Sequence, residues 1–91
     1  MQGVREYYRG MGTTVGVTAI DASADSITVN GRDIVFMCVS GNVWINPNAT
    51  AVADATSLKL TPGTYRKLMV PSVLSVISDG TGGTYQYYLE V

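Results

Sequence analysis

The chain has 91 residues, a formal net charge of −1, and only 14% charged residues against 46% hydrophobic ones. This length gives one domain with a modest core, and the net charge disfavours nucleic-acid binding, which calls for a basic patch. No segment is apolar for long enough to cross a bilayer. From the charge we expect no nucleic-acid partner, and from the lack of such a segment no membrane partner. Soluble domains carry about 25% charged residues, so part of the apolar surface is expected to face another chain.

The first twelve residues, MQGVREYYRGMG, have no hydrophobic period and no N-cap. They predict an extended N-terminal arm over residues 1–12, before a domain over residues 13–91; a short helix over residues 4–9 is the alternative. Two tyrosines lie between arginines here, and both residue types are enriched at interface hot spots. The arm therefore either docks on a partner or is a tail that is disordered or only packs. The candidate partner-binding residues are Val4, Arg5, Tyr7, Tyr8, Arg9 and Met11.

Alternating apolar and small or polar residues predict the next two strands. In residues 13–20, TTVGVTAI, valines alternate with small residues, which indicates a strand with one buried face. Residues 21–25, DASAD, predict a turn, and residues 26–30 place Ile27 and Val29 on one face of a second strand. An Asn-Gly pair follows and predicts a type I′ hairpin, because both residues tolerate positive φ. Either Asn30-Gly31 or Gly31-Arg32 occupies the two central positions.

An unbroken apolar run, IVFMCV, occupies residues 34–39. With turn signals on both sides, it predicts a strand covered on both faces. Its predicted partner is the strand VWI at residues 43–45, folded back across Gly41-Asn42. Cys38 lies inside the run with no cationic neighbour, so we expect a small buried hydrophobe and not a reactive thiol.

The second half predicts further short strands. Residues 46–57 predict an excursion between strands, with a helical turn near residues 49–55 as the alternative. Residues 58–60 predict a short strand, and Thr-Pro-Gly-Thr a type II turn. In the strand at residues 65–70 we expect Leu68 and Val70 inside, with Tyr65 and Met69 on the other face. A proline then ends that strand.

The last part of the sequence predicts two more strands. Residues 73–77 predict an apolar strand, residues 78–83 a flexible hairpin loop, and residues 84–91 a final strand. This strand is expected to place Tyr85, Tyr87, Leu89 and Val91 on one face, with Gln86, Tyr88 and Glu90 on the other. Seven or eight short, mainly antiparallel strands of this kind predict an all-β fold, a single small β-sandwich or jelly-roll-like barrel. The alternative is an open sheet with a helix.

The residues that most catalysis depends on are absent or dispersed. The chain has no histidine, which excludes a histidine-based triad. Its carboxylates are spread through turns and strand ends; Asp21 and Asp25 sharing a calcium ion is a minor alternative to their solvation. The glycine-rich stretch at residues 80–83 joins two predicted strands and so lacks the context of a phosphate loop. We expect no enzyme, no cofactor and no metal.

Aromatic residues leave one binding function open. A carbohydrate- or receptor-binding β module would use Trp44 or exposed tyrosines as platforms, although cross-strand packing is the commoner role of strand tyrosines. Trp44 alternates opposite Val43 and Ile45. Exposure of Trp44 would favour such a module, and burial would count against it.

From Val43 onward the motifs follow a recurring order. They are a V-W-I strand, an Ala/Thr-rich loop, an L-x-L strand with Pro-Gly, a strand ending in V-P, a V-S-V-I strand and a Gly-rich stretch before an aromatic strand. This order resembles small structural proteins encoded by tailed bacteriophages.

The resemblance implies a β-sandwich virion component that binds viral capsid or neck proteins, and we expect a homo-oligomer. It implies a head decoration or cement protein that stabilises the capsid, or, as the alternative, a neck, portal-vertex or tail accessory protein. Deletion of residues 1–12 is expected to leave the domain folded and to weaken its attachment.

Overall fold

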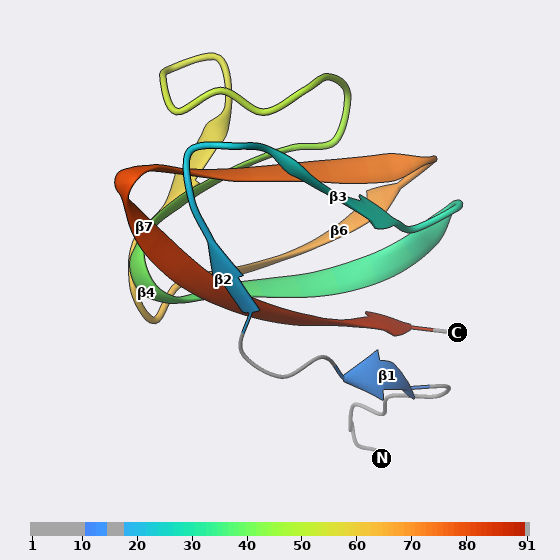
Figure 1. The fold of residues 1–91 in the computed structure, drawn as a ribbon. Helices are drawn as coiled ribbons and strands as arrows, with labels where there is room; N and C mark the ends of the chain where they lie inside the picture. Colours follow the sequence, from blue (N-terminus) through green and yellow to red (C-terminus); the bar gives the residue numbers. More distant parts are fainter. Residues whose placement is uncertain (1–10, 15–17, 91) are drawn as a thin grey trace.

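Two long strands running in opposite directions form the centre of the molecule. The computed structural model describes residues 11–14 and 18–90. Within them, β4 (Arg32–Asn46) pairs antiparallel with β7 (Val73–Glu90) over most of both strands. Figure 1 shows this pair crossing the whole molecule.

Five short strands lie along the two outer edges of this pair. β1 (Met11–Thr14), β2 (Thr18–Ile20) and β3 (Asp25–Thr28) pair with β7, whereas β5 (Leu58–Leu60) and β6 (Tyr65–Val70) pair with β4. All pairings between described strands are antiparallel. The result is one seven-stranded sheet, with β1, β2 and β3 along one edge and β5 and β6 along the other.

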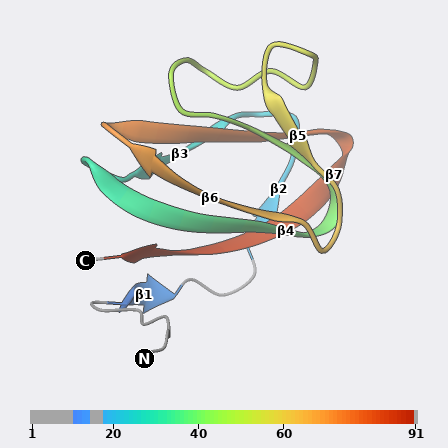
Figure 2. The ribbon, with the colours of Figure 1, turned by 180° about the vertical axis from the view of Figure 1, so that it is seen from behind.

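Both long strands bend at the same level. The register between them shifts between Cys38 and Ser40 and again between Gly41 and Val43, as at β-bulges. Gly41 of β4 and Gly82 of β7 have φ values of 70° and 84°, which favour glycine. The sheet therefore curls over, and in Figures 1 and 2 its two halves face each other.

The inner face of the curled sheet forms the core. Along β4, alternation buries Ile34, Phe36 and Cys38. The Phe36 ring stacks on Tyr85 with centroids 5.0 Å apart, and Tyr85 stacks on Tyr87 at 6.3 Å. Offset aromatic pairs add to the stabilisation from apolar burial. The other buried members of this cluster are Ile20, Ile27, Val29, Val43, Ile45, Leu60, Val70, Leu74 and Val76.

The predicted all-β class is confirmed. The described residues contain seven strands and no helix, so the alternative of an open sheet with a helix does not hold there. The strands belong to one curled sheet, and the finer division into a sandwich or jelly-roll-like barrel stays a prediction. The predicted strand over residues 13–20 corresponds to β1 and β2; residues 15–17, with both of its valines, lie outside the described part.

The predicted reversal at Gly41-Asn42 is wrong. β4 continues through this site, and both Val43 and Ile45 pair with β7 on one side and with β5 on the other. The glycine makes a bulge instead of a turn, because β7 bends beside it and keeps the strands paired. The apolar run before it is fully buried on one face only, since Val35 and Met37 are half-buried.

The predicted hairpin loop at residues 78–83 is also wrong. β7 is continuous from Val73 to Glu90, and Gly83 pairs with Gly41 at the bend. A side chain at Gly83 would meet Ser40, Ser78 and Val43 at 3.0 to 3.2 Å. The glycines allow the two bent strands to approach each other closely.

The Asn-Gly turn is confirmed, but it does not close a hairpin. Asn30 and Gly31 occupy the two central positions with φ values of 54° and 80°, and the Arg32 N–H donates to the Val29 carbonyl at 3.4 Å. β3 pairs with β7, not with β4. The turn therefore carries the chain from one half of the curled sheet to the other.

The remaining strand predictions are largely confirmed. β5 and β6 have the predicted bounds, and β6 ends before Pro71. Gly63 has a φ of 86°, as its predicted turn position requires. Val70 is buried and Leu68 packs partly against the core, while Tyr65 and Met69 are exposed.

Candidate interaction surface

β6 presents the most exposed large apolar side chains of the described residues. Tyr65 is 61% exposed and Met69 is 57% exposed. Alternation along the strand turns Leu68 and Val70 inward and therefore turns Tyr65, Lys67 and Met69 outward. Among the described strands β6 pairs only with β4, so its other edge has no strand beside it. Apolar side chains on a free strand edge mark a site that another chain can cover.

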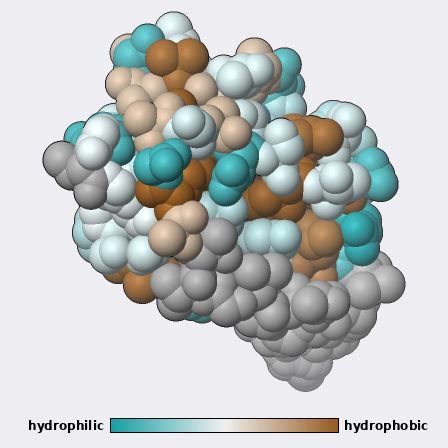
Figure 3. Space-filling model, viewed as in Figure 1, coloured by the Kyte–Doolittle hydropathy of each residue, from teal (hydrophilic) through white to brown (hydrophobic). Residues whose placement is uncertain are grey.

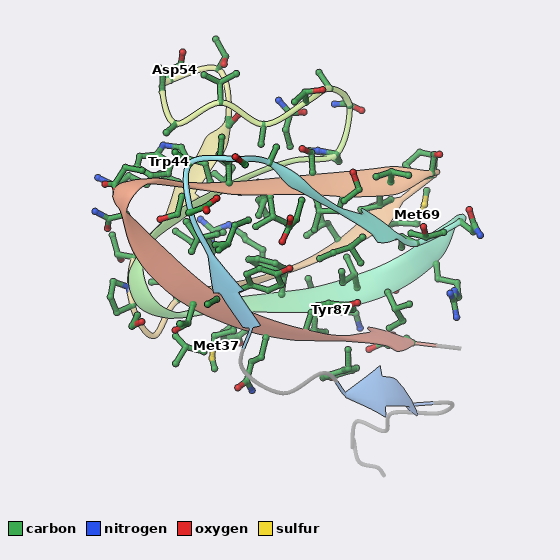
Figure 4. All side chains as sticks on the ribbon, viewed as in Figure 1. Met37, Trp44, Asp54, Met69 and Tyr87 are labelled. Atoms are coloured by element: carbon green, nitrogen blue, oxygen red, sulfur yellow. The ribbon has the colours of Figure 1, made fainter. Side chains whose placement is uncertain are left out.

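The outward face of β6 continues onto β4. Met37 lies opposite Tyr65, and Val35 lies opposite Lys67. Figure 4 shows Met37 outside the curl, on the opposite side of the sheet from Tyr87. We define the β6 surface as Val35, Met37, Tyr65, Lys67 and Met69. Methionine and tyrosine together provide adaptable apolar area with one polar group, a composition typical of protein interfaces.

One ion pair crosses the β6 surface. The Lys67 ammonium nitrogen lies 3.2 Å from a carboxylate oxygen of Glu90 on β7, with β4 between the two strands. Lys67 remains more than half exposed. Because Lys67 already has a partner, a chain that covers Tyr65 and Met69 would not leave an unpaired ammonium beneath it.

A long loop covers the outer face of the other half of the sheet. Residues 47–57 connect β4 to β5, and Figure 1 shows them above the sheet. The Ala51 N–H donates to Ser75 Oγ at 2.9 Å, and Asn46 Nδ2 donates to the Thr56 carbonyl at 3.2 Å. Because Ala51 is buried, these bonds hold the loop against the sheet. The excursion predicted here is confirmed, without a helical turn.

The loop carries its own exposed apolar side chain and borders a shallow groove. Val52 is 47% exposed, and Figure 3 shows hydrophobic surface over this region. The groove has a volume of about 490 Å³, and no charged residue lines it. Its lining residues are Ala24, Ser26, Pro47, Asn48, Ala49, Thr50, Ser72, Val73 and Ser75. Short hydroxyl and amide groups can bind main-chain atoms of a partner, but supply no acid–base chemistry.

Trp44 is buried, at 9% exposure, and so provides no open platform. It lies between Ile77 on β7 and Lys59 on β5, and the Lys59 ammonium sits 5.6 Å from the centre of its ring. This cation–π contact closes the indole from one side. By the criterion set from the sequence, the burial counts against a carbohydrate-binding module.

Cys38 is buried, as predicted. Its thiol lies 3.4 Å from the carbonyl oxygen of Gly41. Burial raises the pKa of the thiol, more than a hydrogen bond to the Val43 backbone lowers it. A nucleophile needs the thiolate, so this environment suits a packed side chain.

The described carboxylates form no cluster. In the described ranges, no three Cys, Asp or Glu side chains gather in a way that would hold a metal ion. Asp21 accepts a hydrogen bond from the Ser23 N–H within its turn. Asp54, at the tip of the loop in Figure 4, is bonded by Thr56, which lowers the pKa of the Asp54 carboxyl. These bonds show carboxylates that organise turns.

Two tyrosines of the last strand, Tyr85 and Tyr87, lie on the inner face of the sheet. Tyr85 is buried, and Tyr87 packs against the core, as predicted for cross-strand packing. Burial raises the pKa of Tyr85, and the nearby Asp25 and Tyr87 add to that rise. Neither ring forms a platform on the surface.

The predicted arm lies almost wholly outside the described residues. Val4, Arg5, Tyr7, Tyr8 and Arg9 fall there. The sixth candidate, Met11, begins β1 and pairs with Glu90.

The sequence did not single out the β6 surface as a candidate site, although the alternation along β6 is visible in it. The sequence feature that could have indicated this surface is the outward placement of Tyr65 and Met69. The sequence alone does not show that β6 lies at an edge of the sheet.

No helix in the described residues is long and apolar enough to span a membrane. Comparison of the chain with protein-family models, with curated proteins and with solved structures finds no match.

Proposed function

We propose that this chain is a non-enzymatic structural protein of a virion, a head decoration or cement protein that stabilises the capsid by binding neighbouring capsid subunits. The observation that carries the proposal is the β6 surface, which exposes Tyr65 and Met69 on a strand edge. The motif order from Val43 onward supplies the link to tailed bacteriophages. Within this proposal, the two halves of the curled sheet are the two layers of a virion β-sandwich.

The energetics of the β6 surface suit a protein that acts by being bound. Burying a side chain of the size of Met69 stabilises a complex by about 1.5 to 3 kcal/mol, before the costs of association. Tyr65 belongs to the residue types that dominate interface energies, and it has few side-chain torsions to immobilise. Val35 and Met37 extend the area that a partner would cover.

A neck, portal-vertex or tail accessory protein of the same virion is the second candidate. It would use the same surface, because a structural role in any part of the particle requires protein contacts and no chemistry. The two candidates differ in copy number: a decoration protein accompanies most capsid subunits, and an accessory protein is present in few copies.

The experiment compares particle attachment of variants of the β6 surface. Tyr65→Ser combined with Met69→Ser should reduce co-sedimentation with purified capsids at least about tenfold, because two apolar contacts are lost. The control is Val52→Ser, which removes an apolar side chain that is 47% exposed on the loop, away from β6. Attachment unchanged in the double variant would overturn the assignment of the β6 surface.

A second experiment tests the predicted arm without disturbing the sheet. Because β1 begins at Met11, a deletion that ends at residue 10 leaves every described strand intact. The proposal predicts an unchanged β-sheet circular dichroism spectrum and weaker capsid attachment. Full attachment of the shortened chain would remove the arm from the mechanism.

A further inference from the structure

The basic residues of the described chain gather on one side of the sheet, whereas its acidic residues are spread over several elements. All the basic residues lie on β5, on β6 or at the start of β4 opposite β6. They are Arg32, Lys59, Arg66 and Lys67. Lys67 is paired with Glu90, whereas Arg66 contacts no carboxylate in the described chain and donates only to the neighbouring Tyr65 carbonyl at 3.1 Å. The guanidinium of Arg66 is therefore exposed on the β6 edge.

The opposite edge carries two exposed carboxylates beside a notch. Asp21 follows β2, and Asp25 begins β3. Together with Ala19 and Ile20 they line a notch of about 280 Å³. Figure 1 looks onto this edge of the sheet, and Figure 2, from behind, looks onto β5 and β6. The acidic notch and the basic edge therefore point away from each other on one molecule.

Neither edge has a neighbour within the described chain. β3 pairs only with β7, and β6 pairs only with β4. Each edge therefore presents main-chain donors and acceptors that another strand can satisfy, as in recognition by strand addition.

We propose that copies of this chain associate head to tail, the β6 edge of one copy pairing with the β3 edge of the next and Arg66 entering the notch between Asp21 and Asp25. Arg66 lies on the same face of β6 as Leu68 and Val70, and Asp25 lies on the same face of β3 as Ile27. If the sheet continues across the two copies, both charged side chains project to its inner face and meet.

A second copy fits this edge because the two charge patterns complement each other. A symmetric contact between two β6 edges would bring Arg66 and Lys67 against the same residues of the other copy. A symmetric contact between two β3 edges would oppose Asp25 with Asp25. Like charges across a strand pair are destabilising, whereas the head-to-tail pairing sets Arg66 of one copy against Asp21 and Asp25 of the next.

A head-to-tail interface uses two different patches on each copy. Such an interface forms a ring if its rotation closes, or a linear array if it does not. This inference builds on the proposed structural role, since it names the surface through which the chains associate with one another. It requires only the purified chain, so it is tested separately from attachment to particles.

Charge reversal on each edge provides the test, with sedimentation velocity of the full chain as the readout. Arg66→Glu alone places a second carboxylate against Asp25, and Asp25→Arg alone places a second guanidinium against Arg66. Each single variant should associate at least about tenfold more weakly than the unaltered chain. An equal mixture of the two should associate again, and so should a chain that carries both changes.

The control is Asp54→Arg, which makes the same change in net charge as Asp25→Arg but lies in the loop, on neither edge. It should associate as the unaltered chain does. Association of the unaltered chain should also weaken as salt is raised from low to physiological concentration, because exposed charges are screened.

An unaltered chain that stays monomeric would overturn the inference, as would single variants that associate normally or a charge swap that fails to restore association. Variants that lose self-association but still attach to particles would leave the proposed function standing. Self-association that persists in a chain absent from particles would support this interface and reject the virion role.

Discussion

Gly41 lies opposite Gly83 at the level where both long strands bend. A Cβ atom on Gly41 would lie 2.5 Å from the Gly82 carbonyl oxygen and 2.8 Å from the Gly83 Cα. Both neighbours are backbone atoms and cannot move aside as a side chain would. The absence of a side chain at Gly41 is therefore a condition for the curl of the sheet.

Gly41→Ala should lower the free energy of unfolding by about 3 kcal/mol, because it combines a positive φ with a clash against backbone. Urea denaturation followed by circular dichroism measures the change. Gly80→Ala is the matched control: it lies in the same bend, nothing approaches its Cβ position, and its φ is not positive. The control should change stability by less than about 0.5 kcal/mol. Equal effects of the two substitutions would contradict the bulge at Gly41.

The buried thiol of Cys38 should make the free energy of unfolding depend on pH. Burial holds the pKa of its thiol above the ordinary value in the folded chain. As pH rises above about 8.5, the unfolded chain loses this proton first, so the free energy of unfolding should fall. Cys38→Ala should show a shallower fall between about pH 8 and 9.5. Tyr85, whose pKa burial also raises, is present in both chains and cancels in the comparison. Parallel pH curves for the two proteins would show that the thiol is not buried.

Ser75 should hold the loop at residues 47–57 on the sheet. Its Oγ accepts the hydrogen bond from the buried Ala51 N–H. Ser75→Ala leaves that donor without a partner, which should cost about 1 to 3 kcal/mol and speed hydrogen exchange at the Ala51 amide. Ser72→Ala is the control, because Ser72 is exposed and only its main-chain carbonyl is used. Unchanged exchange at Ala51 would place the loop away from the sheet.

Trp44 is the one tryptophan of the sequence and reports on its own burial. Its fluorescence should be quenched by iodide far less in the folded chain than in urea. Lys59→Ala removes the ammonium above the ring and should increase quenching, with a stability loss of about 0.5 to 1 kcal/mol. Quenching of the native protein as strong as that of the unfolded chain would restore the binding-module alternative.

Strand positions could be read from the sequence wherever one face is buried. Val70 and Leu68 alternate with Lys67 and Met69, and this period of two settles the orientation of β6 without any tertiary information. The Asn30-Gly31 turn could likewise be predicted, because its positive φ values are a local property.

The bends could not be predicted, because a glycine permits a reversal and a bulge equally. Gly41 and Gly83 are placed in bulged, continuous strands by each other's presence, and their partnership spans forty-two residues of sequence. The β6 surface could not be predicted for the same reason. Tyr65 and Met69 could be placed outward, but the free edge of β6 follows from pairings among strands far apart in the chain.

The most direct test of the central claim is quantitative mass spectrometry of purified virus particles from the genome that encodes the chain. The account predicts that the chain is a particle component, at a ratio near one copy per major capsid subunit for a decoration protein. A small fixed number per particle would place it at the neck or tail. Absence from the particles would contradict the proposed virion role.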